Sequence, residues 1–213
     1  IKNIYVVGAG KASAAMAKAV ERLLGKRITW GLENVKYGHT ASLRRIQLRE
    51  CGHPVPDEAG VEGAREIAAL VAGATADDLV ICVISGGGSA LLPFPAQPLT
   101  LAMKQETTRL LLNSGADITE INTVRKHLSS IKGGWLAALC YPAPVLSLIL
   151  SDVIGNSLDV IASGITAPDS STYADARDIL VRFDLLSRVP PEVRERIEQG
   201  IRGEAAETPK SDH

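Results

Sequence analysis

The first feature of the chain that can do chemistry is a run of three glycines between two serines, "SGGGSA", after the apolar run "DDLVICVI". Apolar runs of this kind are typical of a parallel strand buried on both faces. Successive glycines expose consecutive backbone N–H groups, which form a concave site for an anion such as phosphate. The serine hydroxyls can add hydrogen bonds, which favours a phosphate site over a mere close crossing of a helix and the sheet. The candidate phosphate-binding residues are Ser85, Gly86, Gly87, Gly88, Ser89 and Ala90.

A second candidate is Lys11, in "GAGKAS" at a strand-to-helix turn. Its ammonium group can neutralise charge on a phosphoryl group in transfer, and the alternative is an ordinary surface lysine. Gly8 and Gly10 match the first two glycines of a dinucleotide-binding fingerprint. Ser13 stands at the third glycine, however, and Glu33 is only a weak candidate for the acid that binds a ribose. The spacing of a Walker phosphate loop is also missing.

A third candidate is Asp152, which follows the apolar run "PVLSLILS". We expect that run to form another buried strand, so the carboxylate is fixed near the sheet edge. A carboxylate there can hold Mg²⁺ or take a proton from an attacking hydroxyl. The alternative is that Asp152 caps the following turn. Asp57 and Asp169 each follow a proline and are interpreted first as turn or N-cap residues.

The stretch "DITEINTVRKHLSSIKGGW" predicts one long amphipathic helix. Apolar residues recur along it at steps of three or four and share one face: Ile118, Ile121, Val124, Leu128, Ile131 and Trp135. A neighbouring polar stripe contains Asn122, Arg125, Ser129 and Lys132. Arg125 and Lys132 can bind a substrate carboxylate, whereas the commoner outcome for such a stripe is a solvated face.

These residues need elements that position them, and strands alternate with helices along the whole chain. Five strands are expected, within residues 4–9, 28–38, 45–51, 77–85 and 144–153, with helices between them and two closing helices within 168–201. This alternation predicts an α/β sandwich with a mainly parallel sheet. Ligands of such sheets lie outside the carboxyl ends of the strands, where "GAGKAS", "GHPVPD", "SGGGSA" and "SDVIGN" all fall.

Composition excludes several classes of protein. The 213 residues are 46% hydrophobic and 22% charged with a net charge of −1, which is ordinary for a soluble globular protein. The chain has no basic stripe with interleaved aromatics, so we expect no nucleic-acid partner. It has no apolar run of about 18 residues, so we expect no membrane span. Cys51, Cys82 and Cys140 are far apart and favour reduced thiols in a cytoplasmic protein.

Seven motifs in order resemble the N-terminal domain of the MOFRL-type glycerate 2-kinases, over about residues 4 to 208: "GAGKAS", "KYGH", "GHPVPD", "SGGGSALL", "SGADITEINTVRKHLSSIKGG", "LSDVIGN" and "IASGITAPDSST". The resemblance implies a Rossmann-like three-layer α/β/α domain over residues 1–203. It makes 204–213 a linker towards a C-terminal domain that this chain lacks. It also implies ATP-dependent phosphorylation of D-glycerate at its 2-hydroxyl, with Mg²⁺, to give 2-phosphoglycerate. The resemblance leaves open whether the protein forms a homodimer.

By position, the resemblance makes Lys11 the catalytic lysine, Ser85 to Ala90 the phosphate loop and Asp152 the active-site aspartate and candidate Mg²⁺ ligand. Asn122, Arg125 and Lys132 fall in the family's helical motif and are expected to bind substrate. Three residues depart from the family pattern and affect fine substrate positioning: Asn156, Ile165 and Trp135. We expect the chain alone to turn over little, because one wall of the cleft is missing. The alternatives are an NAD(P)-dependent hydroxypyruvate reductase and a non-catalytic fragment that keeps the fold.

Overall fold

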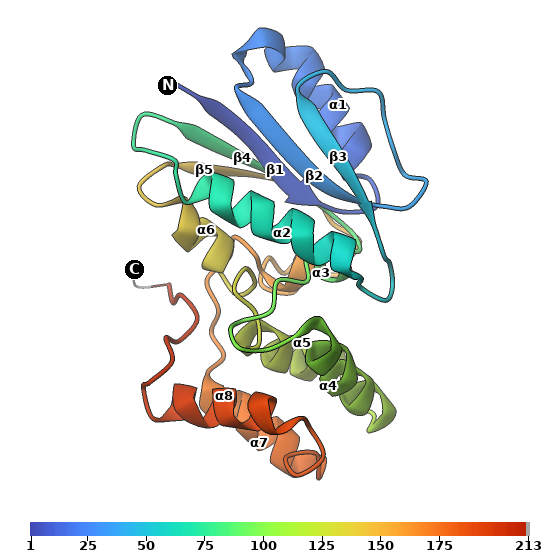
Figure 1. Cartoon of the computed structure of the whole chain (residues 1–213), viewed down its shortest axis with the longest axis vertical. Coiled ribbons are helices and arrows are strands. Elements are labelled where there is room, and N and C mark those ends of the chain that lie inside the picture. Colours follow the sequence, from blue (N-terminus) through green and yellow to red (C-terminus); the bar gives the residue numbers. More distant parts are fainter. Residues whose placement is uncertain (212–213) are drawn as a thin grey trace.

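The computed structural model describes residues 1–211 and contains a five-stranded, all-parallel sheet of order β3-β2-β1-β4-β5. The strands are β1 (Ile4–Ala9), β2 (Trp30–Lys36), β3 (Ile46–Cys51), β4 (Leu79–Ser85) and β5 (Val145–Leu150). Helix α1 (Ser13–Leu24), followed by the short η1 (Gly25–Arg27), covers one face of the sheet, and α2 (Glu58–Val71) and α6 (Trp135–Cys140) cover the other (Figure 1). The predicted α/β sandwich with a parallel sheet is confirmed.

The order of the strands brings two of the candidate loops together. The chain runs outward from β1 to β2 and β3 and then returns to place β4 on the other side of β1. This reversal opens a crevice outside the carboxyl ends of β1 and β4. Ala9 pairs with Ile84 in the sheet, and the Lys11 amide donates to the Gly86 carbonyl at 2.9 Å. The turn after β1 and the glycine loop after β4 therefore leave the sheet side by side.

Both faces of the central strands are buried, as the apolar runs predicted. Val6 and Val83 pack towards α1, while Val7 and Cys82 pack towards α2. Each such side chain contributes about 1.5–3 kcal/mol on burial. The three cysteines are all buried and free, in agreement with the prediction of reduced thiols.

The expectation of a buried strand was wrong for β5. This strand lies at the sheet edge, and Leu146 and Leu150 are 49% and 53% exposed. An apolar run shows that a segment is extended and hydrophobic, but it does not show whether neighbours cover both of its faces. Asp152 therefore follows an edge strand.

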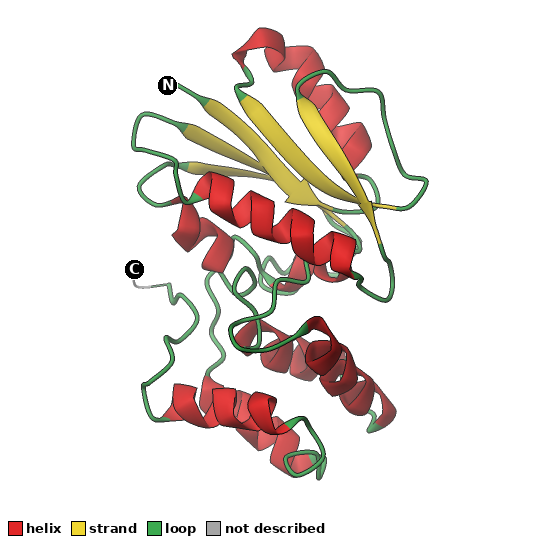
Figure 2. Cartoon of the chain, in the orientation of Figure 1, coloured by secondary structure: helices red, strands yellow, loops and turns green. Residues whose placement is uncertain are grey.

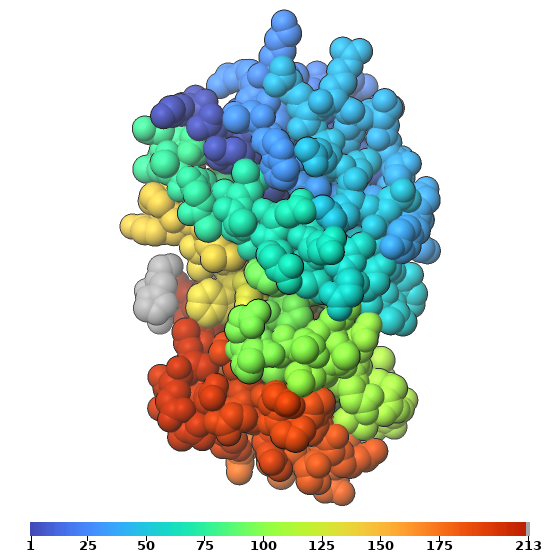
Figure 3. Space-filling model, in the orientation of Figure 1, coloured from blue at the N-terminus to red at the C-terminus, as the bar shows by residue number. Residues whose placement is uncertain are grey.

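Four helices form a lobe with its own apolar core, beyond the carboxyl edge of the sheet (Figures 1 and 2). They are α4 (Leu101–Asn113), α5 (Ile118–His127), α7 (Tyr173–Arg182) and α8 (Pro191–Ile201). In Figure 3 the green surface of the α4–α5 region lies between the sheet layer and the red α7–α8 region. The Thr100 hydroxyl caps α4 by accepting from the Met103 amide, as its sequence position predicted. None of the helices within residues 1–211 has the length and apolar character needed to cross a bilayer.

The single helix predicted over residues 117–135 was wrong, because α5 ends at His127. The Ser129 hydroxyl accepts from the amides of Ile131 and Lys132, which replaces the helical hydrogen bonds. Gly133 and Gly134 then adopt left-handed backbone angles of φ 59° and 88° before α6 begins. The apolar residues thus recur at steps of three and four even across a turn, so this spacing does not mark one continuous helix. The apolar residues of this stretch do not share one buried face either, because Ile118 is 57% exposed.

Residues 204–211, expected as a linker, pack against the helical lobe. Ala205 and Thr208 are buried. The Glu207 carboxylate accepts hydrogen bonds from the Tyr173 amide at 2.9 Å and the Thr208 amide at 2.7 Å, and its Oε1 lies 2.9 Å from His127 Nε2. Asp169 forms the predicted turn, in which its Oδ1 accepts from the Ser171 amide, and it also pairs with the buried Lys126. Whether a domain follows stays a prediction.

Glu207 gives the fold an acid-sensitive contact. Burial acts to raise the pKa of Glu207, but the hydrogen bond with His127 and those from the amides of Tyr173 and Thr208 lower it to about 2. The unfolded value is about 4.3, so this stabilisation is complete above about pH 4.3 and is lost as the pH falls towards 2. We expect Glu207→Gln to lower the thermal unfolding midpoint at pH 7 and to have a much smaller effect at pH 2.5.

Thermal unfolding followed by circular dichroism at both pH values tests this expectation. Asp77→Asn, which removes an exposed carboxylate, is the control and should leave both midpoints unchanged. An equal loss of stability for Glu207→Gln at both pH values would contradict the role of the charged carboxylate.

Candidate active site

Lys11, Asp152 and the glycine loop meet at the carboxyl ends of β1 and β4. Lys11 Nζ lies 3.7 Å from Asp152 Oδ2, and both side chains are partly exposed. A Cβ atom added to Gly86 would lie 2.0 Å from Asp152 Oδ2, and one added to Gly87 would lie 2.8 Å from His53 Nε2. Bare backbone is therefore required here, since it lets the carboxylate and the imidazole approach the loop. Three features that were predicted separately lie in one place.

The glycine loop has free hydrogen-bond donors. Within residues 1–211, the amides of Gly86, Gly87, Gly88 and Ser89 donate to no acceptor, whereas the Ala90 amide donates to the Gly87 carbonyl. Gly87 has a left-handed backbone with φ 86°, a conformation that favours glycine. It precedes the one-turn helix α3 (Gly88–Leu91). Consecutive free amides around such a turn are suited to binding an anion.

The two serine hydroxyls of the loop are used within the protein. Ser85 Oγ accepts from the Ala12 amide at 3.0 Å, which ties the loop to the turn after β1. Ser89 Oγ lies 2.7 Å from Ser163 Oγ, which in turn donates to Asn122 Oδ1 at 3.1 Å. Ser163 belongs to the short η2 (Ile161–Ser163). Within residues 1–211, the buried Asn122 is hydrogen-bonded to the loop through this chain of hydroxyls.

The loop also forms one wall of a cleft of about 760 Å³ between the sheet edge and the helices α4 and α5. Arg125 and Lys132 both line this cleft. Lys132 Nζ is buried and donates to the carbonyls of Ser89 at 2.8 Å and Leu92 at 3.1 Å. The two predicted cations therefore do lie together, although not on one helical stripe.

Two further residues of the cleft were not selected from the sequence. Lys104 of α4 lines the cleft and is only 7% exposed, and a lysine on the apolar side of an amphipathic helix was the available signal. His53 also lines the cleft, beside Gly87. Burial and the nearby Lys11 ammonium lower the pKa of His53 below its usual range, so its ring is neutral at pH 7.

The residues of the site can be compared with those that usually hold Mg²⁺. In the part of the chain that the structure describes, no cluster of three or more His, Cys, Asp or Glu side chains could hold a metal ion. Mg²⁺ in phosphoryl-transfer sites is commonly held by one or two carboxylates together with the substrate phosphates. An accessible Asp152 next to a glycine loop with free amides fits that arrangement.

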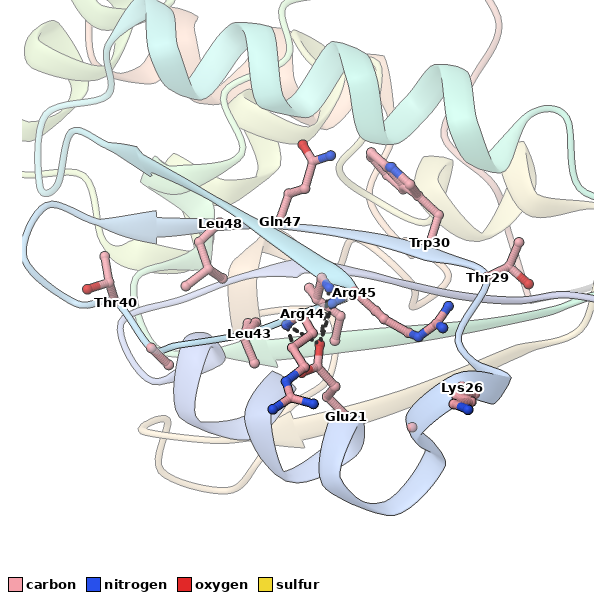
Figure 4. A pocket seen from close by; sticks show the side chains of 13 residues that line it. Glu21, Lys26, Thr29, Trp30, Thr40, Leu43, Arg44, Arg45, Gln47 and Leu48 are labelled. Carbon is pink, nitrogen blue, oxygen red and sulfur yellow. Dashed lines mark hydrogen bonds between the residues drawn. The ribbon is translucent and has the colours of Figure 1, made fainter.

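A second hollow, of about 1150 Å³, lies between α1 and the starts of β2 and β3 (Figure 4). The candidate catalytic and binding residues do not line it. Its acidic group, Glu21, already accepts hydrogen bonds from the amides of Arg44, Arg45 and Ile46. This hollow is larger than the cleft, but it lies away from the carboxyl ends of the strands, where parallel sheets bind ligands.

The structure also shows how Glu33 and Ser13, the two doubtful positions of the dinucleotide-binding fingerprint, are placed. Glu33 lies in the middle of β2 and is fully buried, and burial raises its pKa well above the usual range. A carboxyl group enclosed in the sheet in this way cannot reach a ribose. Ser13, at the third glycine position, is buried and donates to the Gly10 carbonyl.

A parallel sheet in the order 3-2-1-4-5, with a glycine loop at the switch point of its strand order, defines a Rossmann-like α/β domain. Residues 1–198 match the family model described as a domain of unknown function, DUF4147, and the chain belongs to this family.

Named relatives and a solved structure agree with this assignment. The chain is 46% identical over 210 residues to the glycerate 2-kinase of Pyrococcus horikoshii, covering 99% of this chain and 47% of the relative. It is 47% identical over 206 residues to an Agrobacterium vitis protein provisionally named hydroxypyruvate reductase, covering 97% of this chain and 45% of the relative. The crystal structure of glycerate kinase from Thermotoga maritima superposes with a TM-score of 0.90 at 43% identity, covering 99% of this chain and 49% of that one.

These comparisons confirm the resemblance to the glycerate 2-kinases that the motifs indicated. The chain spans about half the length of the curated relatives it matches.

Proposed function

We propose that this chain forms the phosphate-binding half of a glycerate kinase, which transfers the terminal phosphoryl group of ATP to the 2-hydroxyl of D-glycerate and yields 2-phosphoglycerate. The observation that carries the proposal is the row of free amides from Gly86 to Ser89 directly beside Lys11. The names of the Pyrococcus and Thermotoga relatives support it. A cytoplasmic location and a homodimer stay predictions.

The residues of the site can divide the work of phosphoryl transfer. The loop amides hold the phosphate oxygens, and the Lys11 ammonium offsets charge on the group in transfer. The bond from the terminal phosphorus to its bridging oxygen breaks, and a bond from that phosphorus to the glycerate oxygen forms. Asp152 orients the attacking hydroxyl and accepts its proton, or holds Mg²⁺, which when bound offsets phosphate charge.

An ADP-release assay with D-glycerate tests the proposal. It is run on residues 1–213 and on a version extended at its C-terminus by a second half like that of the relatives. We expect the chain alone to bind ATP but to release little ADP, and the extended version to release ADP only when glycerate is present. Glycerate-independent hydrolysis, or full activity from residues 1–213, would contradict this division of the site.

The extended version also distinguishes the kinase from the two alternatives, a hydroxypyruvate reductase and a fragment without chemistry. The name of the Agrobacterium vitis relative favours a hydroxypyruvate reductase, which requires that NADH be oxidised when hydroxypyruvate is added. We expect no oxidation, because Glu33 is buried and Ser13 occupies the third glycine position. A fragment without chemistry would show neither reaction in the extended version.

Gly86 provides a sharper test of the Lys11–Asp152 pair. A Cβ atom at Gly86 would lie 2.0 Å from Asp152 Oδ2, and this carboxylate, in a side chain that is 59% exposed, can swing away. We therefore expect Gly86→Ala to lower the rate of phosphoryl transfer about 100-fold, because a small misplacement of a reacting group is enough for such a loss. The free energy of unfolding should change by less than about 1 kcal/mol.

Steady-state kinetics of the extended version and urea unfolding of the chain measure the two quantities. Asp152→Ala is the matched variant, and Gly86→Ala should add little further loss in that background. A large loss of stability with unchanged kinetics would show that Gly86 serves only the fold.

A further inference from the structure

The cleft beside the glycine loop is lined by more basic side chains than acidic ones. Its lining includes four side chains that are cationic in their usual state, Lys104, Arg109, Arg125 and Lys132, and a single acid, Glu106. Glu106 is already paired with Arg109, since its two oxygens accept from the Arg109 guanidinium at 2.8 and 2.6 Å. The remaining three cations therefore have no anionic partner among the residues that line the cleft.

Lys104 is the least satisfied of the three. Its Nζ atom is buried and has no hydrogen-bond partner within residues 1–211. Lys132 at least donates to two carbonyls, and Arg125 donates to the Thr108 hydroxyl at 3.4 Å. A buried ammonium without a partner costs several kcal/mol unless it loses its proton or meets an anion. Burial and the nearby Arg125 lower the pKa of Lys104 to about 7, so the group is poised between these two outcomes.

The position of the cleft indicates which anion binds there. In the proposed function the free amides of the glycine loop hold the phosphates, and Gly87 forms part of the cleft wall while also lying next to Lys11. An acid whose carboxylate lies among the three cations can therefore present its hydroxyl group towards the loop and Lys11. We infer that Lys104, together with Arg125 and Lys132, binds the carboxylate of a small 2-hydroxy acid, an inference that rests on the proposed function.

The test measures binding of D-glycerate to the chain by calorimetry, with glycerol as the uncharged probe. Lys104→Met keeps the length and apolar stem of the side chain but removes the charge. It should weaken D-glycerate binding at least tenfold, which is the usual size for a lost charge-assisted hydrogen bond. Binding of ATP should change less than twofold. Lys18→Met, which removes an exposed lysine from α1, is the control and should change neither affinity.

Two readouts separate a binding role from a merely structural one. At pH 8, the wild-type chain should take up close to one proton more than Lys104→Met on binding D-glycerate, because the carboxylate favours the charged form of Lys104. Arg125 and Lys132 interact electrostatically with Lys104, and the Glu106–Arg109 pair lines the same cleft. Burial and the nearby Lys104 and Arg125 also lower the pKa of Lys132, so calorimetry in buffers of different ionisation enthalpy compares the proton uptake of the two proteins. Equal uptake by both would contradict the role of Lys104. Without ligand, Lys104→Met should raise the unfolding midpoint at pH 6 by about 3 °C, because an unpaired buried charge is removed.

The outcomes distinguish this inference from the proposed function. If the extended version phosphorylates glycerate and Lys104→Met leaves its KM unchanged, the inference is overturned while the function stands. If glycerate binds through Lys104 but no phosphoryl transfer occurs, the inference stands and the function fails. If Lys104→Met weakens binding of ATP instead of glycerate, the cations serve the nucleotide and the carboxylate assignment is wrong. Binding of D-glycerate no tighter than that of glycerol would overturn the assignment as well.

Discussion

Replacing Lys11 by methionine is expected to lower the rate of phosphoryl transfer to D-glycerate about 1000-fold. Lys11 Nζ is the cation 3.7 Å from Asp152, at the turn whose own amide is bonded to the glycine loop. A preorganised group that offsets charge in a transition state commonly contributes two to three orders of magnitude to the rate. The effect should fall on kcat, because the loop amides still bind the ground-state phosphates.

The measurement is ADP release by the extended version, with the affinity of the chain for ATP determined in parallel. Lys18→Met is the matched control, since it removes an exposed charge from the following helix and should leave the rate unchanged. An unchanged rate for Lys11→Met would show that the lysine is passive and would favour a fragment without chemistry. A loss of ATP affinity with kcat preserved would make Lys11 a binding residue only.

Replacing Gly8 by alanine is expected to have the largest effect on stability, a loss of about 4 kcal/mol or more in the free energy of unfolding. A Cβ atom there would lie 1.9 Å from the Val83 carbonyl oxygen and 2.7 Å from its carbon. These are backbone atoms of the neighbouring strand, and they cannot move aside without separating β1 from β4. The site is built on that strand pair, so ligand binding should be lost as well.

Urea unfolding compares this variant with Gly73→Ala. Gly73 lies after α2, and the nearest atom to an added Cβ is the Leu70 oxygen at 3.5 Å, an ordinary contact. Gly73→Ala should therefore change the free energy of unfolding by less than about 1 kcal/mol. If Gly8→Ala unfolds at the same urea concentration as the wild type, the close approach of β1 and β4 is not as the structure describes.

The sequence by itself determined the α/β class and the place of the site. Strands alternating with helices predict a parallel sheet, and the carboxyl ends of parallel strands share one edge. Lys11, the glycine loop and Asp152 all follow strands, so the sequence placed them at one edge of the sheet, and the order β3-β2-β1-β4-β5 made them neighbours. The run of three glycines also indicated bare backbone, and the collisions at Gly86 and Gly87 show why it is needed.

Only the tertiary structure decided which hydrogen bonds these residues make. Asn122 acts through Ser163 on Ser89, and Lys132 reaches two carbonyls from a turn where periodicity predicted a helix. The position of Lys104 on the apolar side of its helix was visible in the sequence, but only the structure shows that its Nζ atom is buried without a hydrogen-bond partner within residues 1–211. The physical reason is the distance along the chain over which each kind of signal acts. Periodicity reports the local backbone, whereas the partner of a buried polar group is set by segments far away in the chain that fold against it.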